Sequence, residues 1–140
     1  MYVLDTDHIS LIQRGGAEGQ RILAKLAHFQ EDEICVTVIT YEEQIKGWLK
    51  ALSAAKRRED TAFGYLGLKQ TARDFCAIDI LSFDIAAIEQ YEKLRATHRR
   101  LGQNDLKIAA IAIVHDAIVV TRNQKDFRQI IELKSEDWSV

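Results

Sequence analysis

The chain has 140 residues, of which 47% are hydrophobic and 29% charged, and its formal net charge is −2. Such a chain is expected to form one domain over residues 1–140, and its composition excludes the disordered and fibrous classes. Its longest apolar stretch, Ile108–Val114, is too short to cross a bilayer and its first residues do not resemble a signal peptide, so we expect a cytoplasmic protein with no membrane partner.

Two kinds of periodicity alternate along the chain. Short apolar runs rich in β-branched residues predict strands at Tyr2–Leu4, Ile34–Val38, Ile78–Leu81 and Ala117–Thr121, with a weaker fifth at Ile131–Leu133. Helical spacing of apolar residues predicts helices over Ile22–Ala27, Ile45–Leu52, Ile85–Leu101 and the wholly apolar Ile108–Val114. The alternation predicts an α/β fold, with a central parallel sheet of four or five strands and helices on both faces.

One region departs from this alternation. Thr40 to Cys76 holds two helical patterns with no strand between them and a break near Arg58–Asp60, which predicts a helical hairpin leaning away from the sheet. The segment from Gln44 to Arg73 carries seven basic and two acidic residues, so its net charge is +5 and that of the remainder is −7. This segregation suits an anionic partner, although a solvated helix face is the commoner explanation. Cys35 and Cys76 have apolar neighbours and are interpreted as buried thiols.

Acidic residues follow the ends of the predicted strands. Asp5 and Asp7 follow the first strand, Glu43 begins the helix after the second, Asp105 begins the most apolar helix, and Asp126 follows the fourth strand. The functional crevice of an open parallel sheet lies beyond the carboxyl ends of its strands, so we expect these carboxylates to share one rim.

Each acid taken singly has a structural explanation. Thr40 and Glu43 have the spacing of a capping box, Asn104 or Asp105 suits an N-cap, and Asp126 suits the start of a last helical turn. The coincidence of Asp5 with the other three acids at one rim is what favours a functional site.

Carboxylates gathered in a cleft require compensation. Two charges 4 Å apart interact by about 4 kcal/mol at an effective dielectric of 20, so either protons or a hard cation must be bound. Oxygen ligands favour Mg²⁺ or Mn²⁺ over zinc, and His28, His98 and His115 lie far along the chain from the acids. His8 stands beside Asp7 but has no second nitrogen or sulfur ligand nearby, so it is interpreted as a residue of a first helical turn.

Four separated motifs carry a resemblance to a known family. They are LDTDHIS at 4–10, VITYEEQIKG at 38–47, GQNDLKIAAIA at 102–112 and VTRNQKDF at 120–127. Together they resemble the PIN-domain family, and more narrowly its VapC toxins of type II toxin–antitoxin systems. The ending Ser135–Trp138 is similar to that of VapC chains that cut initiator tRNA. The resemblance implies a PIN-like three-layer sandwich and a metal-dependent endoribonuclease whose substrate is RNA, with tRNA among the candidate substrates.

The resemblance also implies roles for individual residues. Asp5, Glu43, Asp105 and Asp126 correspond to the catalytic acids, the first three of them as ligands of Mg²⁺ or Mn²⁺. Supporting roles fall to Thr6, Asp7, Thr121 and Asn123. The chain departs from the usual family pattern in three places: Asp7 replaces an asparagine, Gln103 replaces a proline, and Asn123 stands where many members have an acid, which leaves Asp126 as the fourth acid.

Partners follow from charge and from the resemblance. Basic side chains near the expected rim are assigned to RNA phosphates: Lys46, Lys50, Arg95, Arg99 and Arg100. Similarity to VapC implies a homodimer and a cognate VapB-like antitoxin. The hairpin residues Trp48, Leu49, Leu52, Phe63 and Leu66 are suited either to an amphipathic antitoxin helix or to core packing.

Two other functions fit parts of the sequence. Asp-x-Asp after a first strand is also the signature of haloacid-dehalogenase-like phosphatases, in which Asp5 would be the nucleophile and Asp7 the acid/base. The Gly-Thr that follows that signature is missing here. The second alternative is a non-catalytic module that binds RNA or protein with the same fold.

Overall fold

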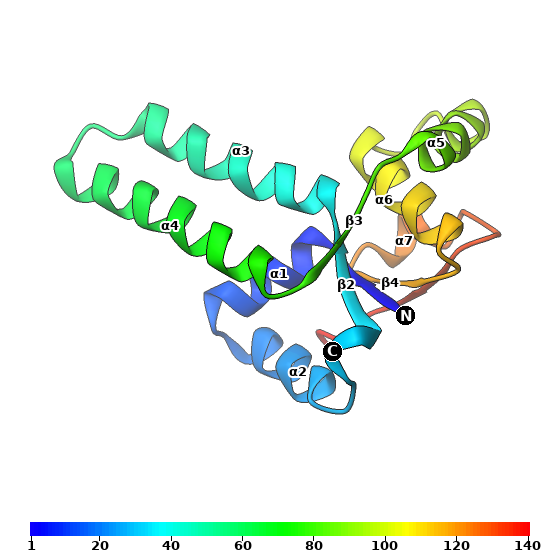
Figure 1. Cartoon of the computed structure of the whole chain (residues 1–140), viewed down its shortest axis with the longest axis horizontal. Coiled ribbons are helices and arrows are strands. Elements are labelled where there is room, and N and C mark those ends of the chain that lie inside the picture. The colour runs from blue at the N-terminus through cyan, green and yellow to red at the C-terminus, as the bar shows by residue number, and fades with distance from the viewer.

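The computed structural model describes all of residues 1–140 and is built on one five-stranded parallel sheet (Figure 1). The strands are β1 (Tyr2–Leu4), β2 (Ile34–Thr37), β3 (Asp79–Leu81), β4 (Ile118–Val120) and β5 (Lys134–Glu136). Their spatial order is β3-β2-β1-β4-β5. Strand order therefore reverses at β1, between β2 on one side and β4 on the other. Such a switch point is where a parallel sheet opens a crevice beyond its strand ends.

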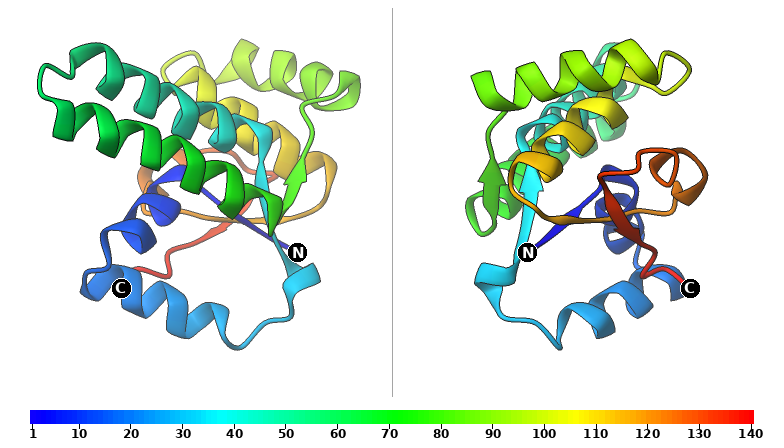
Figure 2. Two further views of the ribbon diagram at one scale, coloured as in Figure 1. Left: turned by 60° about the vertical axis from the view of Figure 1, so that its left-hand side comes forward. Right: turned by 90° about the vertical axis from the view of Figure 1, so that its right-hand side faces the viewer.

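Helices cover both faces of the sheet, as predicted (Figure 2). They are α1 (Thr6–Arg14), α2 (Ala17–Leu26), α3 (Val38–Ala54), α4 (Arg58–Cys76), α5 (Ile85–Thr97), α6 (Gln103–Val114) and α7 (Gln124–Phe127), with a 3₁₀ turn at Glu31–Glu33. Helices α5 and α6 lie on one side of the sheet, and α1 and α2 on the other. Helices α3 and α4 form the predicted hairpin, which extends away from the sheet. No helix is both long and apolar enough to span a membrane.

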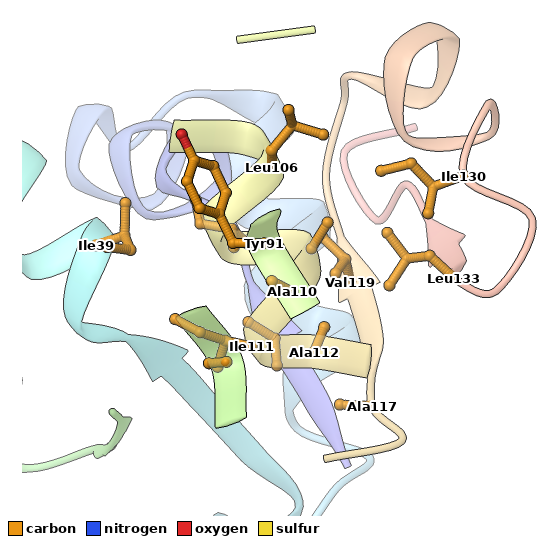
Figure 3. Close-up of a cluster of buried hydrophobic side chains, with 14 of the residues drawn as sticks. Ile39, Tyr91, Leu106, Ala110, Ile111, Ala112, Ala117, Val119, Ile130 and Leu133 are labelled. Carbon is orange, nitrogen blue, oxygen red and sulfur yellow. The ribbon is translucent and has the colours of Figure 1, made fainter. Parts of the chain in front are cut away.

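The core has two parts because neighbouring strand residues face opposite sides. On β1, Val3 joins the larger cluster beneath α5 and α6, whereas Leu4 joins the smaller cluster beneath α1 and α2. Figure 3 shows α6 in the larger cluster, with Ala110 and Ala112 near Val119. All residues from Ile108 to Ala112 are fully buried, which confirms that this is the most buried helix.

Close packing holds the hairpin together. A methyl group on Gly67 would come 2.4 Å from the Trp48 ring, and one on Gly64 would come 2.6 Å from a Leu52 methyl. The indole N–H of Trp48 also donates to the Thr71 hydroxyl at 2.9 Å. Trp48 and Leu52 thus pack within the hairpin.

Three local predictions were wrong. The fifth strand lies at Lys134–Glu136 and not at 131–133, because Leu133 is used for the core while Ile131 is 94% exposed. Cys76 is exposed at the end of α4, although Cys35 is buried as expected and burial raises the pKa of its thiol to about 11. There is no capping box at Thr40.

The actual start of α3 explains the missing capping box. The helix begins at Val38, and its N-cap is Thr37, whose hydroxyl oxygen accepts the Thr40 N–H at 3.2 Å. Thr40 and Glu43 are therefore inside the helix. Their side chains are free to face the edge of the sheet.

Candidate active site

The candidate site lies at the carboxyl ends of the three central strands. β1 ends at Leu4 and leads into Asp5, β4 ends at Val120 and leads into Thr121, and β2 leads into α3. Because these strands are parallel neighbours, the residues that follow them lie at one edge. This edge is the switch point of the sheet.

Asp5 is the most buried carboxylate, with 5% of its surface exposed. It is the N-cap of α1, where Oδ1 accepts the Thr6 N–H at 2.7 Å and Oδ2 accepts the Thr121 hydroxyl at 2.8 Å. Burial, together with the charges of Asp7 and Asp105, raises the pKa of Asp5 to about 7, although its two hydrogen bonds oppose the rise. The carboxylate is therefore held in a place that disfavours its negative charge.

Asp105 lies in the first turn of α6, but Gly102 is the N-cap of that helix. Burial raises the pKa of Asp105, and the nearby Glu43 and Asp126 carboxylates raise it further. The side-chain amide of Asn123 opposes the rise, since it donates to Asp105 at 3.2 Å and to Asp126 at 3.1 Å. Asn123 thus lies between two acids that would otherwise repel each other.

Glu43 reaches the same edge from the second turn of α3. Its Oε1 accepts the Thr6 hydroxyl at 2.8 Å, and that hydroxyl also lies 3.1 Å from the Thr40 hydroxyl. Thr6 therefore connects the start of α1 to the start of α3. The charge interactions of Asp105 with Glu43 and Asp126 and of Asp5 with Asp105 link all four predicted acids electrostatically.

The donor set fits a hard divalent cation. All four acids offer oxygen, and two of them have raised pKa values, which is the condition that a bound cation relieves. No three Asp, Glu, His or Cys side chains are arranged closely enough to enclose a metal ion by themselves. A hard divalent cation bound here would therefore need water molecules or substrate oxygens among its ligands.

Asp7 and His8 have surroundings that the sequence did not reveal. Asp7 accepts hydrogen bonds from the His8 ring at 2.8 Å and from the Arg122 N–H at 3.0 Å, and its Oδ2 lies 3.2 Å from the Thr121 hydroxyl. His8 is fully buried and also contacts the C-terminal segment at Trp138. The Glu-Asp-Trp ending was the one sequence signal of this contact, but nothing in it pointed to His8.

The basic residues assigned to RNA are exposed and lie in two groups. Lys46 and Lys50 are on α3, where Lys46 also pairs with Glu42 at 3.6 Å. Arg95 lies on α5 and Arg99 in the turn after it, and both line a surface cavity of about 530 Å³ that also includes Gln103, in the same first turn of α6 as Asp105. Arg100 also lies between α5 and α6 and lines a second cavity with Arg99. This group therefore lies near the start of the helix that carries Asp105.

Comparison with known proteins agrees with this geometry. The family model described as PIN domain matches residues 2–133. Ribonuclease VapC1 of Haemophilus influenzae (strain R2866) is 28% identical over 152 residues, which cover 99% of this chain and 98% of the relative. The tRNA(fMet)-specific endonuclease VapC of Shigella flexneri is 28% identical over 116 residues, or 80% of each chain.

A solved structure matches across the whole fold. It is the crystal structure of VapBC2 from Rickettsia felis bound to a DNA fragment from their promoter. The match has a TM-score of 0.74 and 26% identity, and it covers 98% of both chains.

Proposed function

The chain belongs to the PIN-domain family, and on that premise we propose that it is a VapC-type ribonuclease toxin that uses a divalent metal ion. The single observation that supports this most is the meeting of Asp5, Glu43 and Asp105 at the switch point of the sheet, where burial raises the pKa of two of these acids. We further propose that residues 1–140 form one PIN domain. We also propose a cytoplasmic location, because the proposed substrate, RNA, is found there.

In this proposal Asp5, Glu43 and Asp105 hold Mg²⁺ or Mn²⁺ with the help of water, and Asp126 is the fourth acid. The bound ion would lower the pKa of a water molecule and neutralise charge on the scissile phosphate. Thr121 and Thr6 orient the carboxylates of Asp5 and Glu43 by their hydrogen bonds. Attack by water, and not by the ribose hydroxyl, leaves a 5′-phosphate and no cyclic phosphate.

Substrate binding is assigned to exposed arginine and lysine side chains on two helical regions near the acids. An acidic centre repels phosphates, so RNA must be attracted by charges around it. Arg95, Arg99 and Arg100 come shortly before α6, which carries Asp105, and Lys46 and Lys50 lie on the helix that carries Glu43. Contacts of this kind hold the RNA backbone without reading its sequence. Separate incubations with total RNA, tRNA and an RNA oligonucleotide will decide whether tRNA is the target, as it is for the Shigella flexneri relative.

We propose that a VapB-like antitoxin binds the hairpin and that the toxin is a homodimer. Phe63, Leu66 and Leu49 are 65%, 60% and 51% exposed, and the first two line a surface cavity of about 530 Å³ with Trp48. An amphipathic helix with apolar residues one turn apart would cover these side chains. Light scattering of the isolated chain, and of the chain with its antitoxin, tests both assemblies.

The two alternatives are less compatible with the site. A phosphatase would need Asp7 free to exchange protons with substrate, but this carboxylate already accepts hydrogen bonds from His8 and Arg122. In a non-catalytic module the buried acids with raised pKa values would lower the stability of the fold at neutral pH without contributing to binding.

The test is incubation of the purified chain with total RNA, isolated tRNA and an RNA oligonucleotide, with Mg²⁺ or with chelator. We expect cleavage only with metal, 5′-phosphate ends, and no cleavage by Asp5→Asn. Asp116→Asn, on the turn after α6, is the matched control and should cleave like the original chain. Intact RNA in every reaction of inhibitor-free protein, or release of phosphate from a small phosphate ester, would overturn the proposal.

A further inference from the structure

His8 connects the C-terminal segment of the chain to the acidic site. Its imidazole is fully buried, and its two ring nitrogens face two different parts of the chain. Nε2 lies 3.1 Å from the backbone nitrogen of Trp138, and Nδ1 lies 2.8 Å from Oδ1 of Asp7. A buried histidine with both nitrogens bonded has a fixed orientation, because turning the ring would break both bonds.

The bond to Trp138 fixes which nitrogen of His8 carries the proton. A backbone N–H can only donate, so Nε2 must accept and carries no proton. The proton of the neutral ring is then on Nδ1, which donates to Asp7. The Asp137 carboxylate, 3.7 Å from Nε2, is too far to reverse this choice, and it already accepts the N–H and hydroxyl of Ser139.

On this basis, and resting on the proposed metal-dependent function, we propose that the C-terminal segment Glu136–Ser139 is a positioning element of the active site, acting through His8 on Asp7. His8 is thus a positioning residue that does not touch metal or RNA. Asp7, in turn, is an anchor for the site, since each of its two carboxylate oxygens accepts a hydrogen bond from the protein.

Asp7 transmits this positioning to both halves of the site. Its Oδ2 accepts the N–H of Arg122 and lies beside the Thr121 hydroxyl, which bonds Asp5. The residue after Arg122 is Asn123, whose amide holds Asp105 and Asp126. The turn after β4 is therefore fixed by Asp7 at the point where it supports three of the four acids.

The C-terminal segment is itself held firmly enough to act as a support. Trp138 is 4% exposed, and its ring is stacked 5.2 Å from Phe29. Its indole N–H donates to Glu136 at 2.7 Å, and the Arg21 side chain donates to the Ser139 carbonyl at 2.6 Å. The Trp138 N–H thus comes from a segment anchored by packing and by hydrogen bonds at both ends.

Two substitutions of His8 separate its two bonds. Asparagine carries its amide nitrogen close to the place of Nδ1, whereas glutamine reaches the place of Nε2. His8→Asn therefore keeps a donor for Asp7, and His8→Gln keeps an acceptor for Trp138. Each loses one buried bond, so both should lower the melting temperature by comparable amounts. His115→Gln, exposed at the end of α6, is the control for exchanging a histidine.

The measurement is Mn²⁺ binding by calorimetry at pH 8, together with the melting temperature in chelator. We expect both His8 variants to weaken Mn²⁺ binding about tenfold, the size of effect typical of residues that orient metal ligands, because each breaks one of the two bonds that link the C-terminal segment to Asp7. His115→Gln should bind as the original chain does. Binding by His8→Asn within twofold of the original chain would show that the bond to Trp138 does not support the site, and it would overturn the proposal.

A measurement on the unmodified chain covers the case in which a variant does not fold. ¹⁵N NMR of the His8 ring should show a proton on Nδ1 and none on Nε2, and the reverse pattern would overturn the proposal. Failure of the proposed function is recognised separately, because the original chain would then bind no Mn²⁺ or Asp105→Asn would bind it equally well.

Discussion

The hydroxyl oxygen of Thr121 lies 2.8 Å from Oδ2 of Asp5, although 116 positions separate the two residues in the chain. The contact exists because β1 and β4 are paired in parallel, so the residues that follow them meet at the same height. Asp5, the most buried acid of the site, thus receives a hydrogen bond from a neutral hydroxyl group. Thr121 therefore sets both the orientation of Asp5 and the ease with which it ionises.

Thr121→Val tests this contact, because valine keeps the shape of threonine and lacks its hydroxyl. We expect Mn²⁺ affinity to fall about tenfold, since Asp5 loses a donor to its charged form. Thr121→Ser keeps the hydroxyl and should lose no more than about threefold of the affinity. Calorimetry at pH 8 measures both variants. Equal binding by the valine and serine variants would show that the hydroxyl is irrelevant.

Asp5→Asn tests the charge cost of the site. The pKa of Asp5 is about 7 in the folded protein against an ordinary value of 3.8, so the folded state binds more protons between these values. Its contribution to stability is therefore lost as pH rises from about 4 to about 7. In chelator at pH 8 we expect Asp5→Asn to be more stable than the original chain by up to about 4 kcal/mol.

Urea denaturation at pH 8 and near pH 4 measures this difference. The extra stability of Asp5→Asn should nearly vanish near pH 4, because in the folded protein the Asp5 side chain is then protonated and as neutral as asparagine. An advantage of the same size at both pH values would mean that ionisation of Asp5 is not its cause. Asp116→Asn, away from the acids, serves as the control.

Asn123→Asp tests the amide that separates two acids. The substitution replaces a donor shared by Asp105 and Asp126 with a third carboxylate. Without metal at pH 8, we expect the free energy of unfolding to fall by about 1–3 kcal/mol, the usual cost of losing a buried partner. Saturating Mg²⁺ should restore most of the loss. Gln20→Glu on α2 adds the same charge elsewhere and should have no such metal-dependent effect.

Gly67→Ala tests the contact between α3 and α4. The added methyl group would lie 2.4 Å from the Trp48 ring, so the helices must separate, and we expect a loss of about 1–3 kcal/mol. Gly47→Ala is the matched control, because nothing lies within 4 Å of its new methyl group. That change should stabilise the chain by about 0.5–1 kcal/mol. Urea denaturation measures both, and a neutral Gly67→Ala would contradict the close contact.

Arg99→Gln tests the proposed path of RNA beside α5. We expect KM to rise with little change in kcat, because a phosphate contact binds substrate and transition state alike. The slope of log affinity against log salt concentration should fall by about 0.7 if one phosphate of a single strand is released. Arg58→Gln at the hairpin tip is the control. An unchanged salt dependence in Arg99→Gln would place the RNA elsewhere.

Local patterns predicted the parts of the fold that depend on neighbours in sequence. The strand at Tyr2–Leu4 and the wholly apolar run of α6 are visible without coordinates. The meeting of Asp5 and Glu43 at one edge was also predictable, because parallel strands leave their following residues on the same side. The position of β5 was not, since Leu133 is apolar for a reason other than strand pairing.

Contacts between distant segments explain what the sequence left hidden. His8 looked like an ordinary helical residue because its partner Trp138 is 130 positions away. Cys76 has apolar neighbours in sequence, yet its own position on α4 faces solvent. Thr40 and Glu43 had the spacing of a capping box, but Thr37 fills the capping role and leaves Thr40 beside Thr6.

The central place of β1 has a consequence for how the molecule matures. The strand is synthesised first, but its partner β4 is synthesised more than a hundred residues later. A nascent chain is able to join β1 to β2 while the other side of β1 stays open, and the cleavage centre is assembled only when Thr121 arrives. We therefore expect ribonuclease activity only after most of the chain has been translated.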